Sequence, residues 1–241
     1  MDEHRPPREL LDTSVRYSPD AAACEILTAP IRNVLAEVDR RIAGNEPAGA
    51  EHLLLQLRRA APGSVHVNML LAGLYCEHRQ YSNALPLLNA VLAVDTQFSP
   101  AMVRKADALY RLDRVGEAVA IARTLATLDP NNAEYLNNLG TYQQAAGNFE
   151  EAGTAFSQAI AIRPDFVAAW HNLLQLPDRT LDGAQLEHVK ALCTDPALSD
   201  RQRAMASLCV GRHYRMRGDV SREFAWLERG KSALAELSPW D

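Results

Sequence analysis

Apolar residues recur along the middle of the chain with a period of 34 positions. Residues 65–98, 99–132 and 133–166 form three blocks that align without a gap. In each block a small residue is followed, at steps of four, three and three, by residues that keep one helical face apolar. These predicted core positions are, block by block, Ala84, Ala118 and Ala152; Leu88, Ala122 and Phe156; Val91, Leu125 and Ala159; Val94, Leu128 and Ile162.

The first half of each block predicts another helix, with a small residue at Ala72, Ala106 and Gly140 that would admit a neighbour. Turns are predicted at residues 78–80, 112–114 and 146–148. Proline ends two of the blocks, because it cannot continue a helix. Each block is therefore a helix pair, and since one pair cannot bury its apolar face alone, neighbouring pairs must stack.

Residues 133–166, AEYLNNLGTYQQAAGNFEEAGTAFSQAIAIRPDF, resemble the tetratricopeptide repeat. The aromatic residue typical of the fourth position is replaced by Leu136, whereas the next block has Trp170 there. The resemblance implies an all-α fold, a right-handed superhelical solenoid of helix-turn-helix repeats whose concave inner face forms a groove.

Weaker copies extend the array in both directions. Residues 31–64 keep the second-helix pattern, but Asn45 to Pro47 replace the usual turn, so only that second helix is supported. Residues 167–203 begin with the repeat pattern, but Pro177 to Arg179 end the first helix early. The sequence predicts its partner helix from about Gly183 to Thr194. Residues 204–237 predict capping helices. We expect residues 1–20 to be disordered and residues 21–241 to form the solenoid.

Composition and charge narrow the classes of function. Apolar residues make up 47% of the 241 positions and aromatic residues only 6%, which favours close-packed helices. The net charge of −5 gives no field that would attract nucleic acid or an anionic membrane. The start lacks an apolar leader, and no apolar run reaches membrane-spanning length. We expect a cytoplasmic protein whose four cysteines, without a CxxC pair, are buried and reduced.

Catalytic motifs are missing from the sequence. It contains no GxxxxGK[ST], GxGxxG or HExxH pattern, and the repeats leave no room for a catalytic domain. We therefore expect no enzyme, no cofactor and no metal. Cys209 and His213 are four apart on a predicted helix, but two ligands do not make a metal site. We interpret Cys209 as a packed core residue and His213 as a residue at the solvent edge.

The resemblance also implies which first-helix positions look into the groove: the second, fifth, sixth, ninth, twelfth and thirteenth. The candidate partner-binding residues are Arg104, Asp107, Arg111, Asn137, Asn138, Thr141, His171 and Asn172. Asn138 and Asn172 are equivalent, and their amides could clamp a peptide backbone or simply be solvated. Arg104 and Arg111 could bind a carboxylate or sulfate group, or could pair with Asp107 between them.

A more particular resemblance concerns the C-terminal end. Residues 210–231, followed by Pro239-Trp240-Asp241, are similar to the end of the repeat region in bacterial repeat-containing sulfotransferases. Glu223 departs from that pattern, where the family usually has Ala. The sequence lacks the phosphosulfate-binding loop, an Arg-Ser-Gly-type turn after a strand. The resemblance therefore implies the non-catalytic accessory part of such an enzyme.

Three functional hypotheses follow. The leading one is a non-catalytic scaffold that binds a peptide or protein partner in its concave groove. The alternative is the accessory repeat region of a sulfotransferase-like enzyme. The third is a homodimer formed through an apolar C-terminal end that comprises Phe224, Trp226, Leu237 and Trp240.

Overall fold

The fold is all-α in the part of the chain that the computed structural model describes, residues 29–44 and 46–237. Twelve helices follow one another there without a strand, and none of them is both long and apolar enough to cross a membrane. The chain divides between Ala101 and Met102 into two compact units, which are treated separately below.

The first unit contains two complete helix pairs and the beginning of α5. Its helices are α1 (Ala29–Ala43), α2 (Pro47–Ala60), α3 (Val65–Glu77), α4 (Tyr81–Val94) and the start of α5 (Ser99–Arg111). Leu54, Leu71 and Leu88 are fully buried in one continuous apolar core. The sequence supported only α2 in the first pair, yet α1 is also helical. Pro47 stands at the first position of α2, where proline fits a helix.

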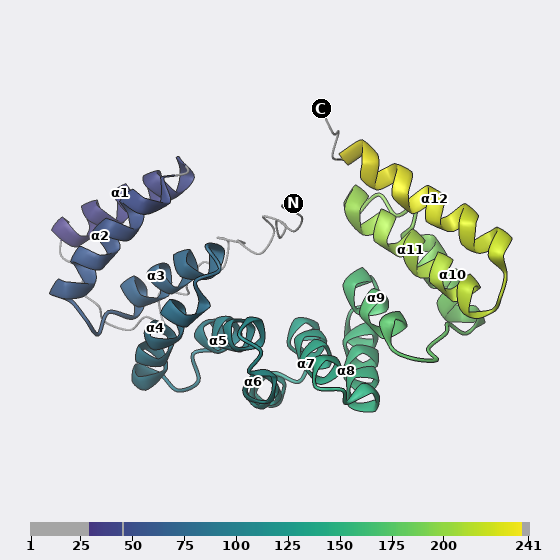
Figure 1. Cartoon of the computed structure of the whole chain (residues 1–241), viewed down its shortest axis with the longest axis horizontal. Helices are drawn as coiled ribbons and strands as arrows, with labels where there is room; N and C mark the ends of the chain where they lie inside the picture. Colours follow the sequence, from purple (N-terminus) through teal and green to yellow (C-terminus); the bar gives the residue numbers. More distant parts are fainter. Residues whose placement is uncertain (1–28, 45, 238–241) are drawn as a thin grey trace. The chain divides into compact units, whose positions relative to one another are not determined.

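The second unit contains the remaining helices. Its helices are the rest of α5, then α6 (Val115–Leu128), α7 (Ala133–Ala145), α8 (Phe149–Ile162), α9 (Val167–Gln175), α10 (Gly183–Leu192), α11 (Asp200–Met216) and α12 (Val220–Leu237). Helices α7 and α8 pack side by side, as do α11 and α12 (Figure 1). The predicted break is present: α9 is only nine residues long and Asp178 has a φ of 54°.

The turns within the three central pairs lie where the sequence predicted them. Each pair reverses over three residues, and the middle residue takes the left-handed conformation: Arg79 (φ 57°), Asp113 (φ 60°) and Gly147 (φ 81°). A left-handed residue after a helix lets its terminal carbonyls accept hydrogen bonds from the turn. The reversals therefore follow from local backbone chemistry.

The sequence predicted four sets of core positions on the second helices, and the prediction was wrong for the last set. The first three sets of positions are buried, and Phe156, Val91 and Ala159 have no exposed surface. Val94, Leu128 and Ile162 instead expose 66%, 40% and 40% of their surface. The last position follows the first by ten residues. At about 100° per residue, its side chain points about 80° away from that of the first position around the helix. This set thus lies at the edge of the face, on the last turn of its helix.

Close packing of α7 on α8 depends on Gly140. A Cβ placed there would lie 2.5 Å from the ring of Phe156, closer than carbon atoms can approach. The small residue predicted from the sequence therefore admits the aromatic ring of its own repeat, and the two residues form one packing unit.

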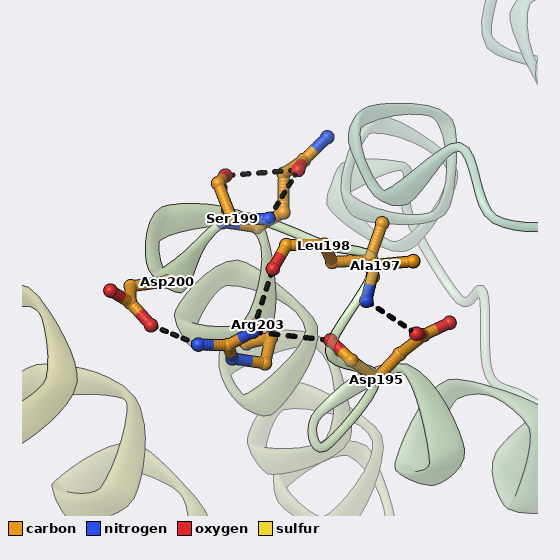
Figure 2. Close-up of polar contacts among 7 residues, drawn as sticks. Asp195, Ala197, Leu198, Ser199, Asp200 and Arg203 are labelled. Atoms are coloured by element: carbon orange, nitrogen blue, oxygen red, sulfur yellow. Dashed lines mark hydrogen bonds and ion pairs between the residues drawn. The ribbon is translucent and has the colours of Figure 1, made fainter.

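The start of α11 is held by a group of polar contacts in the preceding loop (Figure 2). Ser199 and Gln202 form a capping box, which satisfies the first free N–H groups of the helix. The Arg203 guanidinium donates to the carbonyl oxygens of Leu198 (2.7 Å) and Asp195 (3.2 Å) and also contacts Asp200 (Figure 2). The loop and the first turn of α11 are thereby tied together.

His213 does not lie at the solvent edge, as the sequence had suggested. It exposes only 2% of its surface, and its Nδ1 accepts a hydrogen bond from the backbone N–H of Leu181 at 3.2 Å. Cys193 and Cys209 are buried as predicted, Cys76 is half-buried, and Cys24 lies outside the described residues. Within residues 29–44 and 46–237, His, Cys, Asp and Glu side chains form no group of three suited to a metal ion.

The fourth position of a repeat can anchor the end of the repeat before it. Trp170 Nε1 donates to the carbonyl oxygen of Pro164 at 2.8 Å, and Asn68 Nδ2 donates to that of Pro62 at 2.9 Å. Both donors stand six residues after the proline that closes the preceding helix pair. In these two repeats, the same side-chain position therefore ties one repeat to the next.

Replacing Trp170 with phenylalanine keeps an aromatic ring but removes the indole donor to the Pro164 carbonyl oxygen, which His188 Nε2 also contacts at 2.9 Å. We expect Trp170→Phe to lower the free energy of unfolding by at least about 1 kcal/mol, because a typical hydrogen bond is lost and the smaller ring leaves a space. Urea unfolding followed by circular dichroism measures it. Trp226→Phe is the matched control, because Trp226 is half-buried and its indole makes no hydrogen bond within the described residues. Equal losses in the two variants would contradict the anchoring role.

Candidate partner-binding surface

The eight predicted partner-binding residues lie on three helices of the second unit, α5, α7 and α9. Helices α7 and α9 contact each other, and Tyr110 of α5 packs against Tyr142 of α7 with their ring centroids 5.2 Å apart. We call the eight residues together the first-helix surface. The structure therefore places them on neighbouring helices, although they come from three different repeats.

Arg104 is the most available cation on the first-helix surface. Its side chain is half-buried and has no hydrogen bond or ion pair within the described part of the chain. Arg111 Nε lies 3.5 Å from Asp107 Oδ1, and both side chains expose more than two fifths of their surface. An exposed pair at this spacing contributes only about 0.3–0.5 kcal/mol. A ligand could therefore replace Asp107 as the partner of Arg111 at little cost.

The three asparagines have different environments. Asn172 Nδ2 donates to Asn137 Oδ1 at 3.0 Å, and Thr141 Oγ1 donates to the Asn137 carbonyl oxygen at 3.0 Å. Asn137 is buried, so these contacts join α7 to α9. Asn138 is half-buried, and its amide makes no hydrogen bond within the described residues. Of the two equivalent asparagines, Asn172 thus has a structural partner, whereas the Asn138 amide makes no hydrogen bond within the described residues.

The surroundings of His171 favour its uncharged form. Burial and the nearby Arg212 guanidinium lower its pKa, and its Nε2 lies 3.2 Å from the amide nitrogen of Gln175. A neutral imidazole can accept from that amide. His171 therefore offers a hydrogen-bonding ring at this surface and adds no positive charge to those of Arg104 and Arg111.

Sequence reasoning missed Arg212 of α11. Its guanidinium donates from Nε to the carbonyl oxygen of Leu174 and lies 3.5 Å from that of Gln175, at the end of α9. A cation there satisfies free carbonyls and complements the helix dipole. Arg212 occupies the ninth position of the last repeat, one of the groove positions implied by the family, so a signal existed.

The charges on and beside this surface are mainly positive. Three cations, Arg104, Arg111 and Arg212, outnumber the one carboxylate, Asp107, although the net charge of the chain is −5. Burial, together with the Asp107 carboxylate, raises the pKa of Tyr142 well above its usual range, so its hydroxyl stays neutral. These side chains therefore give the surface a local excess of positive charge.

Three family models match the sequence, and each is described as the tetratricopeptide repeat. They cover residues 35–101, 75–140 and 133–166, which together extend over more than half of the chain. The chain is a tetratricopeptide-repeat protein. The 34-residue helix pair is thus its repeating unit, and the first-helix surface is built from the first helices of consecutive tetratricopeptide repeats.

Solved structures show the same fold. A tetratricopeptide repeat protein from Parabacteroides merdae is 16% identical, with 84% of this chain and 79% of that chain covered and a TM-score of 0.66. BtubC (BKLC) from P. vanneervenii is 15% identical, covers 85% and 93%, and has a TM-score of 0.60. MamA from Desulfovibrio magneticus RS-1 is 11% identical, covers 87% and 98%, and has a TM-score of 0.56. No curated protein matches this tetratricopeptide-repeat sequence.

Proposed function

We propose that this tetratricopeptide-repeat protein is a non-catalytic scaffold that binds an acidic peptide, or an acidic segment of a protein, on its first-helix surface. The observation that carries the proposal is Arg104, a half-buried cation with no partner within the described residues. Burying part of a guanidinium without a counter-charge is unfavourable unless a ligand supplies one. Asn138, one repeat further along the chain, adds an amide that makes no hydrogen bond within the described residues.

The chemistry of recognition follows from these two side chains. A guanidinium binds a carboxylate through two parallel hydrogen bonds, which gives direction as well as energy. The Asn138 amide can both donate to and accept from a peptide backbone. Because both residues stand on helices held by a packed core, little ordering of the protein is needed, and the entropic cost falls mainly on the peptide.

Fluorescence anisotropy with labelled acidic and neutral peptides selected from an array tests the proposal. We expect acidic peptides to bind, with affinity that falls as salt rises. Arg104→Ala should weaken binding at least tenfold, since a charged hydrogen bond contributes about 1.5–3 kcal/mol. Asn138→Ala should weaken it less. Arg123→Ala, an exposed arginine on the second helix α6, is the matched control and should leave binding unchanged. Failure of every acidic peptide, or binding that survives Arg104→Ala, would refute it.

A second proposal is the accessory region of a sulfotransferase-like enzyme. The apolar side chains at the start of α12 support it, because Val220 and Phe224 expose 72% and 64% of their surface. An apolar patch of this kind is typical of a surface that another domain covers. Reading the gene beyond the codon for Asp241 tests the idea: a reading frame that ends without a catalytic domain would defeat it.

We also propose that the C-terminal end supports a homodimer. Phe224 is exposed there, whereas Trp226 is half-buried against the core around α11. Trp240 and the side chain of Leu237 lie outside the described residues. Static light scattering at increasing concentration tests this proposal, and a constant monomer mass would exclude it.

A further inference from the structure

One repeat of the second unit lacks the anchor that its neighbour has. Leu136 occupies the fourth position of α7, where Trp170 stands in α9, and a leucine side chain cannot donate a hydrogen bond. Pro130 is the equivalent of Pro164. Within residues 29–44 and 46–237, no group donates to the Pro130 carbonyl oxygen. The position that receives an indole N–H in the next repeat is therefore unused here.

A hollow lies at this position. It has a volume of about 580 Å³ and is open to solvent between α6, α7 and α8. Pro130, Leu136 and Leu139 line it, with Ala161 and Ile162 of α8. Because Ile162 lines a hollow that is open to solvent, it remains partly exposed at the edge of the apolar face. The walls are mostly apolar, although Thr127 and Gln158 also line the hollow. Trp170, one repeat later, likewise packs in an apolar cluster beside the carbonyl oxygen of a proline.

The rim of the hollow carries one cation. Arg123 of α6 lines it, is exposed, and makes no side-chain hydrogen bond or ion pair within the described residues. An occupant that complements all three features has an aromatic ring for the apolar walls, an N–H for the Pro130 oxygen, and a carboxylate for Arg123. Tryptophan next to an acidic residue meets these requirements.

The chain itself contains such a pair. Of its three tryptophans, Trp170 is buried and Trp226 packs within its own unit, so both are used. The third, Trp240, is preceded by Pro239 and followed by Asp241. We propose that residues Pro239 to Asp241 of a second copy of this chain dock in the hollow, with the Trp240 indole donating to Pro130 and Asp241 pairing with Arg123.

The occupant belongs to a second copy because the same copy cannot reach. Contacts run from α12 to α11, from α11 to α9 and from α9 to α8, so three helix-to-helix steps separate α12 from the hollow. Each step is about 8–10 Å. Trp240 follows the last helical residue, Leu237, by three positions, a span of about 10 Å at full extension. The contact is therefore intermolecular. This inference rests on the homodimer proposed above and gives it a defined site.

Sedimentation equilibrium of the full chain and its variants tests the inference. We expect a dimer whose dissociation constant rises at least tenfold in Trp240→Ala and in Leu136→Trp. Leu136→Trp fills the hollow with the side chain that the next repeat uses, so it should fold normally and unfold at a higher urea concentration. Arg59→Ala, an exposed arginine on the second helix α2 that belongs to neither proposed surface, is the matched control and should dimerise like the unchanged chain.

A charge exchange adds a second readout. Arg123→Glu should weaken the dimer, and combining it with Asp241→Lys should restore much of the loss, because the ion pair is re-formed in reverse. Dimers that persist in Trp240→Ala or in Leu136→Trp would overturn this inference and leave self-association through Phe224 standing. A chain that stays monomeric at every concentration would overturn the homodimer proposal together with the inference.

Discussion

Phe156→Ala is expected to lower the free energy of unfolding by about 3–5 kcal/mol, the usual cost of deleting a buried aromatic ring. Phe156 has no exposed surface and packs against Gly140, whose missing Cβ makes room for the ring. Truncation would leave a cavity between α7 and α8 that rigid helices cannot close. Because repeats gain stability from their neighbours, the loss should also weaken the adjoining pairs.

Urea unfolding followed by circular dichroism measures this loss, and hydrogen exchange shows which repeats open. Phe149→Ala is a matched control on the same helix, because Phe149 exposes 44% of its surface and should cost much less. A second check is Gly140→Ala, whose added methyl group would overlap the Phe156 ring and should cost about 1–3 kcal/mol. Similar losses for Phe156→Ala and Phe149→Ala would contradict the packing described here.

The second large effect is expected at His213. His213→Leu would leave the buried N–H of Leu181 without an acceptor, which costs about 1–3 kcal/mol. His213→Asn keeps an acceptor near the position of Nδ1 and should retain more of the stability. The free energy of unfolding of both variants, measured at pH 7.5, tests the hydrogen bond, and equal losses would argue for a packing role alone.

The pH dependence has a defined sign. Burial lowers the pKa of His213, and the positive charges of Arg217 and Lys190 lower it further. The unfolded chain, with a histidine pKa of about 6.5, then binds more protons than the folded chain as the pH falls below that value. Stability should therefore decrease from about pH 7 downward until the folded-state pKa is passed.

Urea unfolding at a series of pH values from 7.5 to 5 measures this slope. His213→Asn should flatten it, because asparagine does not titrate. His171→Asn is the comparison: the pKa of His171 is also lowered, chiefly by burial, so it should remove a separate share of the slope. A slope unchanged in His213→Asn would show that the hydrogen bond from Leu181 does not control the acid sensitivity.

The two proposed binding surfaces differ in the helices that form them. The first-helix surface comes from α5, α7 and α9, whereas the hollow faces α6 and α8 and takes its floor from the start of α7. One copy could therefore bind an acidic partner through Arg104 while its hollow holds a second copy. The matched arginine variants, Arg104→Ala and the Arg123 changes, separate the two events experimentally.

Much of the fold could be predicted before any coordinates were known. The 34-residue period, the short reversals at residues 78–80, 112–114 and 146–148, and the early end of α9 are all encoded locally. Helical periodicity, left-handed turn residues and proline act within a few neighbouring positions. For the same reason, the eight candidate residues were correctly assigned to first helices from the repeat register.

Long-range packing set the remaining features. The exposure of Val94, the burial of His213 and the contact of Arg212 with the end of α9 each depend on residues more than thirty positions away or on the exact rotation of a helix. The hollow beside Leu136 likewise exists only because three helices meet around a side chain too small to fill the space. Local preferences determine where a helix begins and ends, whereas burial and free hydrogen-bonding groups depend on which distant segments pack against it.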